Sequence, residues 1–244
     1  PRRQRARRAS LGAAEDPLGE RLDLVVGRLG LRRHRHRAPF ALATLANALG
    51  KGGFGVGLAG GDQSRYVRWW RGTPVAEALD AHVRAGKPLG GTSAGLAMLG
   101  EYLYGAMDGG SQISPRALAD PLGSSNTIET DFLHIELLKG IITDTHFSER
   151  NRLGRLIAFV AKGESLAGHP LLGIGVDEDA AVAVDAKGAA RVFATAAGAG
   201  ATIVKGGFAT QVEDEPMQLA RVHTLRAGVD SVLHLPQGSV EKPS

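Results

Sequence analysis

Short apolar runs and segments of helical spacing alternate along most of the chain. Residues 54–59 (FGVGLA) form a continuous apolar run before Gly60–Gly61, which is typical of a buried parallel strand and its exit turn. Apolar side chains over 64–85 recur every three to five positions, which predicts a helix. A second short strand is predicted at 87–90, followed by a helix over about 95–104.

The alternation continues in the second half and gives the predicted fold class. Residues 140–143 predict a strand, 148–162 an amphipathic helix, and 171–178 a strand that ends in acidic residues. Further short strands or hairpins are predicted at 180–184, 189–194, 201–206 and 221–235. This order favours an α/β fold of three layers (α/β/α) with a mainly parallel sheet, extended by antiparallel strands at the C-terminal side.

The first 37 residues differ in charge from the rest. They hold eleven Arg against four acidic residues, a charge of +7, whereas the whole chain is +4, so residues 38–244 carry −3. We expect 1–37 to be partly disordered, because so charged a segment cannot offset its ordering entropy by burial. A short helix is predicted at 39–49, and residues 38–244 are predicted to form a single α/β domain. Nucleic-acid binding by the arginines is the alternative, but no aromatic residues are interleaved with them, so we predict no nucleic-acid partner.

Composition excludes several kinds of chemistry. The chain has no Cys, which excludes disulfides, thiolate zinc sites and a cysteine nucleophile. No apolar run approaches the roughly 20 residues that span a bilayer, so no membrane partner is expected. The sequence begins with Pro1 and has no signal segment, and we expect a cytoplasmic enzyme, with secretion of a processed chain as the alternative. We predict no metal and no organic cofactor.

The sequence Gly91-Thr92-Ser93-Ala94-Gly95 lies between a predicted strand and a predicted helix. A nucleophile on such a turn sits in strained backbone and needs small neighbours on both sides. The pattern indicates Ser93 as a nucleophile, with the amide of Ala94 available to an oxyanion. A glycine-rich turn with a helix-capping serine is the alternative interpretation.

A serine nucleophile needs a base and an acid. His146 directly follows the strand at 140–143, and Asp177 and Glu178 end the strand at 171–178. Active sites of open α/β sheets gather at the carboxyl ends of strands, so these residues favour a triad of Ser93, His146 and one of the two acids. A capping histidine and a polar turn are the alternatives.

Two further clusters are candidates for binding. Gly61, in Gly60-Gly61-Asp62-Gln63, could offer a second oxyanion amide, and Gln63 could hydrogen-bond a substrate. Arg150, Arg152 and Arg155 follow His146, and guanidinium groups beside a hydrolytic site could hold a carboxylate. A solvated basic helix face is the alternative for the arginines.

Four ordered blocks carry a family resemblance: GGDQ (60–63), GGTSAG (90–95), DTHF with R-x-R-x-x-R (144–155) and GIGVDED (173–179). Over about residues 54–206 the chain resembles the cyanophycinase and dipeptidase E family of serine peptidases. The resemblance implies a class I glutamine amidotransferase-like fold and cleavage at β-aspartyl linkages. Cyanophycin, a poly-aspartate with arginine on each side-chain carboxyl, is the leading substrate, and β-Asp-Arg dipeptides are the product. The alternatives are an aspartyl dipeptidase of the dipeptidase E type and a catalytically inactive relative.

The resemblance also implies roles for single residues. Ser93 is the nucleophile, His146 the base and Glu178 the acid, with Asp177 as the alternative acid. The positions that match the family's substrate pocket are Gln63, Asp144, Thr145, Arg150, Arg152 and Arg155. Thr145 stands where cyanophycinases usually have Gln, and residues 1–53 lack the family's apolar first strand and Gly-rich loop. A homodimer is compatible with this interpretation.

Overall fold

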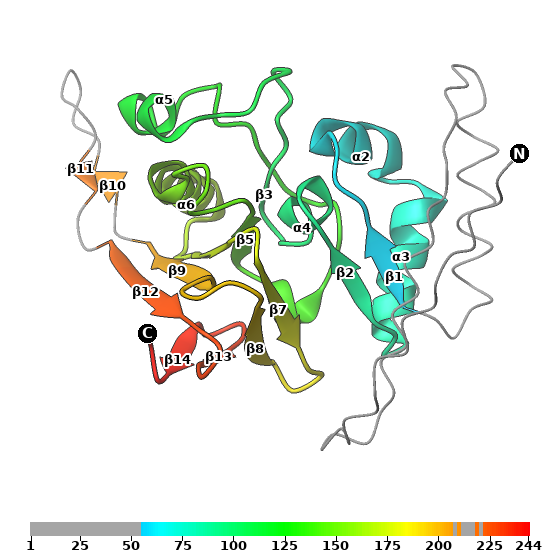
Figure 1. Cartoon of the computed structure of the whole chain (residues 1–244). Coiled ribbons are helices and arrows are strands. Elements are labelled where there is room, and N and C mark those ends of the chain that lie inside the picture. Colours follow the sequence, from blue (N-terminus) through cyan, green and yellow to red (C-terminus); the bar gives the residue numbers. More distant parts are fainter. Residues whose placement is uncertain (1–54, 207–208, 211–217, 220–221) are drawn as a thin grey trace, which may run out of the picture.

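The computed structural model describes residues 55–206, 209–210, 218–219 and 222–244, and the predicted segment 1–37 and helix 39–49 lie outside them. The described chain is a mixed α/β structure (Figure 1). Its helices are α2 (Gln63–Trp70), α3 (Pro74–Arg84), α4 (Ala94–Ala97), α5 (Ser114–Ala119) and α6 (Leu153–Ala167), with a 3-10 turn at Glu136–Leu138. Its strands are β1 (Val56–Leu58), β2 (Leu89–Gly91), β3 (Leu103–Tyr104), β4 (Ile128–Glu129), β5 (Ile141–Asp144), β6 (Leu172–Val176), β7 (Ala180–Val184), β8 (Ala189–Ala194), β9 (Ala201–Lys205), β10 (Ala209–Thr210), β11 (Gln218–Leu219), β12 (His223–Ala227), β13 (Val232–His234) and β14 (Ser239–Glu241).

The sheets are partly antiparallel. One four-stranded sheet has the order β12-β9-β6-β5, in which β5 and β6 are parallel while β6–β9 and β9–β12 are antiparallel. A second sheet, β14-β13-β8-β7, is antiparallel throughout, and β1 pairs with β2 in parallel. The described strands therefore do not form the mainly parallel sheet that we predicted. Parallel neighbours need a crossover, usually helical, and residues 177–200 between β6 and β9 contain no helix.

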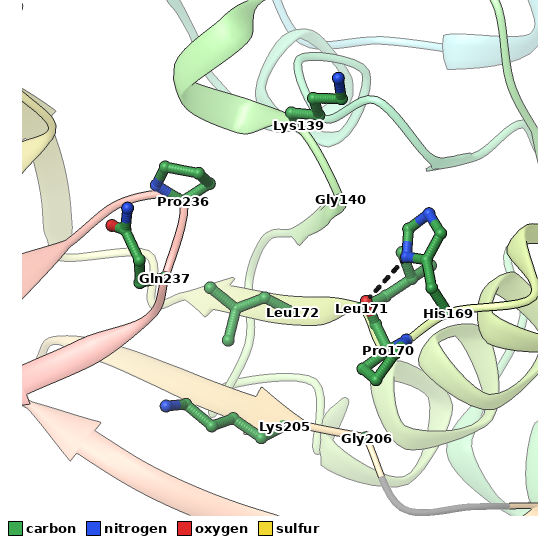
Figure 2. A pocket seen from close by; sticks show the side chains of 10 residues that line it. All are labelled: Lys139, Gly140, His169, Pro170, Leu171, Leu172, Lys205, Gly206, Pro236 and Gln237. Carbon is green, nitrogen blue, oxygen red and sulfur yellow. Dashed lines mark hydrogen bonds between the residues drawn. The ribbon is translucent and has the colours of Figure 1, made fainter.

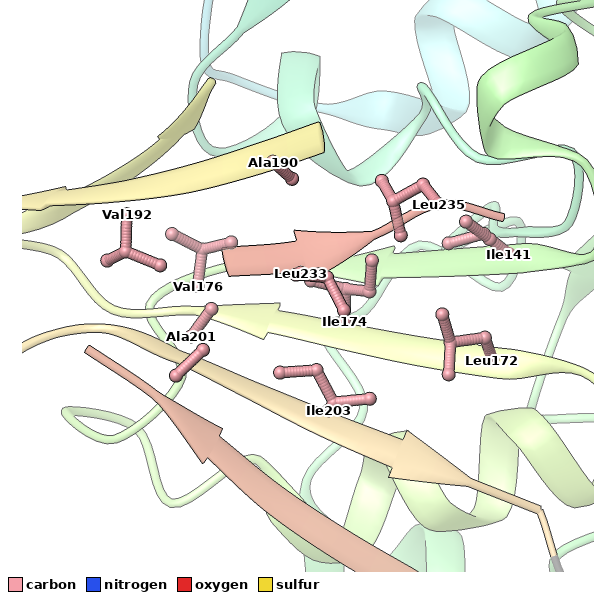
Figure 3. Close-up of a cluster of buried hydrophobic side chains, with 11 residues drawn as sticks. Ile141, Leu172, Ile174, Val176, Ala190, Val192, Ala201, Ile203, Leu233 and Leu235 are labelled. Carbon is pink, nitrogen blue, oxygen red and sulfur yellow. The ribbon is translucent and has the colours of Figure 1, made fainter. Parts of the chain in front are cut away.

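The two four-stranded sheets share one apolar core (Figure 3). In β6, Leu172, Ile174 and Val176 lie in this core with side chains of β8, β9 and β13. Alternate residues of a strand point to opposite faces, so the intervening glycines Gly173 and Gly175 face the other way. On this face a second sheet stands where the three-layer prediction placed helices.

Helix α6 covers the opposite face of the β5–β6 pair. Leu156, Phe159 and Val160 pack with Ile142 and neighbouring apolar side chains in a separate cluster. A Cβ added to Gly173 would lie 2.8 Å from a methyl carbon of Val160, so the glycine lets the helix approach the sheet closely.

Three predicted helices have different bounds in the structure. The one at 64–85 is two helices, because Gly72 has φ 64° and Thr73 caps a new helix that starts with Pro74. The one at about 95–104 is wrong beyond Ala97, since the chain then runs beside β5 and Tyr102 bridges Ile142 in parallel. The one at 148–162 begins only at Leu153, after a turn that follows His146.

Candidate active site

Ser93 stands on a sharp turn between β2 and α4. Its backbone has φ 53° and ψ −122°, a left-handed conformation that non-glycine residues rarely adopt. The flanking glycines make the turn sterically feasible. A Cβ at Gly91 would overlap the carbonyl of Gly95, and a Cβ at Gly95 would overlap the carbonyl of Leu58. The spacing of the G-x-S-x-G sequence is therefore explained by two close backbone approaches.

Ser93, His146 and Glu178 form a continuous chain of hydrogen bonds. The Oγ of Ser93 lies 2.8 Å from Nε2 of His146, and Nδ1 of the same ring lies 2.6 Å from Oε1 of Glu178. The three residues follow the carboxyl ends of β2, β5 and β6. The His146 side chain is 23% exposed and that of Glu178 is 43% exposed, so water and a ligand can reach the pair.

The His146 loop is anchored by its neighbour Phe147. His146 itself has φ 47°, while Phe147 is buried and its amide donates to Val176 O at 3.2 Å. The Phe147 ring occupies the space left by Gly175, where any added Cβ would overlap it. Strand β6 thus contributes to the core, and at Gly175 it leaves the space in which the Phe147 ring packs. This packing fixes the turn after β5.

The two acids at the end of β6 have different partners. Glu178 reaches the imidazole, whereas Asp177 is buried and its carboxylate accepts from Ser148, Gly200 and Arg226. The geometry therefore places Glu178 and not Asp177 in the hydrogen-bond chain of His146.

The two predicted oxyanion donors lie close to the serine. A Cβ added to Gly60 would lie 3.0 Å from the Ser93 Cβ, and Gly61 follows with φ 143°. Ala94 is the first residue of α4, where backbone amides lack partners within the helix. Donation from these amides to an oxyanion stays a prediction.

Three residues predicted to line a substrate pocket form a buried ionic cluster. The Arg155 guanidinium binds both carboxylate oxygens of Asp144, and the two side chains are 3% and 2% exposed. Arg152 donates to Thr145 O at 2.8 Å and lies 3.6 Å from Asp144. Burial, and then the charge of Arg155, lowers the pKa of Arg152 to about 10.

The donors and acceptors of the buried cluster bond largely to one another. The amide of Thr145 donates to Asp144, and Thr145 is 5% exposed. Direct contact of Asp144, Thr145, Arg152 and Arg155 with a substrate stays a prediction. By contrast, Arg150 is 53% exposed with Nε 3.8 Å from Glu178, and Gln63 is half-buried and donates to Tyr104 O.

Sequence reasoning missed several residues that support the site. Ser148 and Glu149 bind the residues that follow β6, since Ser148 donates to Asp177 and the Glu178 amide donates to Glu149 at 3.0 Å. Ser111 accepts from Arg155 at 3.2 Å. Arg226 comes from β12, 49 residues beyond Asp177, and nothing local in the sequence points to this pairing.

A separate hollow of about 380 Å³ lies at the opposite end of the same strands (Figure 2). It is lined where β5 and β6 begin, by Gly140 and Leu172, and by Lys139, His169 and Lys205. Ser93 and His146 do not line it. Within the described residues no helix is long and apolar enough to cross a membrane.

Comparisons with known proteins agree on one family. Residues 53–192 match peptidase family S51. The cyanophycinase of Trichormus variabilis is 41% identical over 128 residues, which cover 51% of this chain and 37% of that protein. The cyanophycinase of Synechococcus elongatus is 38% identical over 142 residues, which cover 57% of this chain and 38% of that protein.

The chain is also similar to solved structures. The crystal structure of a peptidase from an acI-B1 Actinobacterium has a TM-score of 0.45 and 16% identity, and the match covers 79% of this chain and 63% of that one. The family match includes Ser93, His146 and Glu178 and more than half of the sequence. The chain belongs to peptidase family S51.

Proposed function

We propose that the chain is a serine-type peptidase that hydrolyses β-aspartyl linkages. The observation that carries this proposal is the hydrogen-bond chain from Ser93 through His146 to Glu178, with separations of 2.8 and 2.6 Å. A hydroxyl, an imidazole and a carboxylate in this order are the elements of nucleophilic acyl transfer.

Each group has a role in the proposed reaction. Ser93 Oγ attacks the scissile carbonyl carbon while His146 Nε2 takes the hydroxyl proton, and Glu178 stabilises the imidazolium and holds its orientation. The amides of Ala94 and Gly61 receive the oxyanion. The imidazolium then protonates the leaving amine, and a water molecule activated by His146 releases the acyl group and restores Ser93.

The proposed substrate is cyanophycin, cleaved to β-Asp-Arg dipeptides. Support comes from the similarity to two proteins named cyanophycinase and from the motif blocks that carry the resemblance. Such a substrate presents both carboxylates and guanidinium groups. Arg150 is exposed beside Glu178 and is suited to a carboxylate, and Gln63 offers a half-buried amide at the start of α2. We assign the buried Asp144 and Arg155 to the wall behind these groups.

We also propose the class I glutamine amidotransferase-like arrangement for the part of the chain that carries the site. Its support is the parallel β1–β2 and β5–β6 pairs and the strand–turn–helix unit that presents Ser93. The C-terminal strands add the antiparallel sheet to that arrangement.

The test combines labelling and kinetics. A fluorophosphonate probe should label the wild-type chain, and Ser93→Ala should remove both labelling and hydrolysis, with a loss of several orders of magnitude in kcat at unchanged Tm. Retention of activity in folded Ser93→Ala would overturn the assignment of the nucleophile.

Substrate choice is decided by three parallel assays. Release of β-Asp-Arg from cyanophycin should be faster than release of β-Asp-Lys from a lysyl analogue, because a guanidinium makes directional, bidentate hydrogen bonds that an ammonium group cannot make. Faster turnover of α-aspartyl dipeptides than of the polymer would place the chain with aspartyl dipeptidases. An unlabelled, folded wild-type chain would instead indicate an inactive relative.

A further inference from the structure

Asp177 joins two loops of the candidate site by one buried carboxylate. Its Oδ1 accepts from the Ser148 amide at 3.1 Å and from the Ser148 hydroxyl at 2.7 Å. Ser148 lies two residues after His146, and Asp177 lies directly before Glu178. The carboxylate therefore fixes the loop of the base relative to the strand end that carries the acid.

The second oxygen of the same carboxylate connects this point to the C-terminal strands. Oδ2 accepts from the Gly200 amide at 2.9 Å and from the Arg226 guanidinium. Arg226 also donates to Thr202 Oγ1 at 3.0 Å and to Gly198 O at 2.7 Å, so it binds the start of β9 as well. Both Gly200 and Arg226 lie beyond residues 53–192, the part that matches the family.

The charge of Asp177 is stabilised where it lies. Its side chain is 2% exposed. Burial raises the pKa of Asp177, but hydrogen bonds from Arg226, Ser148 and Gly200 outweigh that effect and hold the pKa below its ordinary value. The group is thus a charged acceptor at every pH at which a histidine base is neutral.

We propose that Asp177 and Arg226 are positioning residues that hold His146 at hydrogen-bond distance from Ser93 and Glu178. This inference rests on the proposed function, since it assigns the pair a task in that reaction. Only a few backbone residues connect Asp177 to the base, since Asp177 binds Ser148, two residues after His146. Between them, the Phe147 ring packs against Gly175. His146 has a left-handed backbone, which needs such support from the residues that follow it. Neither residue touches the reacting atoms.

The test uses three variants and a matched control. Asp177→Asn removes the charge and places an amide against a donor, and Arg226→Met removes the guanidinium. Arg226→Lys restores a cation at the same place. Arg71→Met is the control, because Arg71 binds Glu129 at 2.8 Å with a side chain 34% exposed, close to the 27% of Arg226, and lies outside the site.

We expect kcat to fall about 10- to 100-fold in Asp177→Asn and Arg226→Met while KM stays nearly constant, since a small displacement of a reacting group costs rates on this scale. Arg226→Lys should recover part of the loss. Arg71→Met should keep kcat and KM even where its Tm falls. Folded Asp177→Asn with wild-type kcat, or equal losses in Arg71→Met and Arg226→Met, would overturn the proposal.

A second readout does not depend on turnover. Proton NMR of ¹⁵N-histidine-labelled protein should show a low-field imidazole proton from the His146–Glu178 hydrogen bond, assigned by its loss in His146→Gln. The resonance should persist in Arg71→Met and disappear in Asp177→Asn and Arg226→Met. Its persistence in both of the latter would refute positioning even if the wild-type chain proved inactive, and inactivity alone would refute only the proposed function.

Discussion

Two side-chain pairs each have one member at the end of strand β5, and the pairs differ in exposure. His146 and Glu178 have side chains 23% and 43% exposed, whereas Asp144 and Arg155 are 2% and 3% exposed. Only one residue, Thr145, separates Asp144 from His146 along the chain. The comparison shows that neighbouring residues at one strand end belong to a partly exposed pair and to a buried pair.

The two pairs differ in whether they can exchange a proton with a ligand or with water. An imidazole can both accept and donate a proton, so a partly exposed His146 is suited to proton transfer. A buried guanidinium–carboxylate pair is a fixed pair of charges whose separation would leave one of them unpaired in the interior. The first pair should therefore control rate and the second should control stability.

The largest effect is expected at the exposed pair. Glu178→Gln keeps the shape of the side chain but removes the charge that stabilises the imidazolium, and kcat should fall by about 10³–10⁴. The Tm should stay near the wild-type value, because the carboxylate is substantially exposed. Steady-state kinetics and calorimetry on the same sample measure both quantities, and a fall in Tm with little change in kcat would reverse the comparison.

The buried pair should show the opposite balance. Arg155→Met leaves the Asp144 carboxylate without its main partner and should lower the free energy of unfolding by about 3–5 kcal/mol. Asp144→Asn combined with Arg155→Met should recover part of this loss, since no charge is left unpaired. Urea unfolding at neutral pH measures the series, with the exposed Arg150→Met expected within about 0.5 kcal/mol of wild type.

The close contact between Gly175 and the Phe147 ring offers a test with a smaller, purely steric effect. Gly175→Ala places a methyl group where the Phe147 ring lies, so unfolding free energy should fall by about 1–3 kcal/mol and kcat should decrease with it. Gly57→Ala is the matched strand control, because no atom lies within 4 Å of its added Cβ. Equal behaviour of the two variants would show that Phe147 does not position the loop.

The smallest effect is expected at a third pair, outside the site. His134 Nδ1 lies 2.7 Å from Asp80 and Nε2 lies 3.1 Å from Asp131, and hydrogen bonding to Asp80 raises the pKa of His134. A raised pKa stabilises the fold below the unfolded pKa of about 6.5, and this stabilisation is lost as pH rises through the folded pKa. His134 is 60% exposed, so the effect should stay below about 1 kcal/mol.

A pH series separates this third pair from the reactive one. The wild-type Tm should fall more between about pH 6 and pH 8 than that of His134→Gln, while kcat is the same in both proteins. A steeper slope in His134→Gln would mean that the neutral imidazole is the form favoured by folding.

The sequence predicted those parts of the site whose signals are local. Small residues around Ser93 predicted the tight turn, and the placement of His146 and the acids after apolar runs predicted a shared edge. The residue pattern alone could not separate Asp177 from Glu178, because both acids directly follow the strand and only tertiary contacts decide which of them is buried.

Predictions that depended on contacts between residues far apart in the sequence were less accurate. Apolar residues after Ala97 have helical spacing, yet they are buried because the chain runs beside β5. The antiparallel C-terminal strands were predicted correctly, but their pairing partners were not, because tertiary contacts place β9 directly beside β6 and so make the sheet less parallel than predicted. Arg226 is a further example, since its contact with Asp177 can form only when β12 lies beside β9.

The pairing of Asp177 with Arg226 also bears on synthesis of the chain, because the two residues are far apart in the sequence. A ribosome delivers Ser93, His146 and Glu178 well before Arg226, which follows Asp177 by 49 residues. Chains begin to fold from the N-terminal side while they are still being made. If the pair positions His146 as proposed, a nascent chain that already contains the three site residues would lack this ion pair, and the full rate of hydrolysis would be reached only when β12 has left the ribosome and paired with β9.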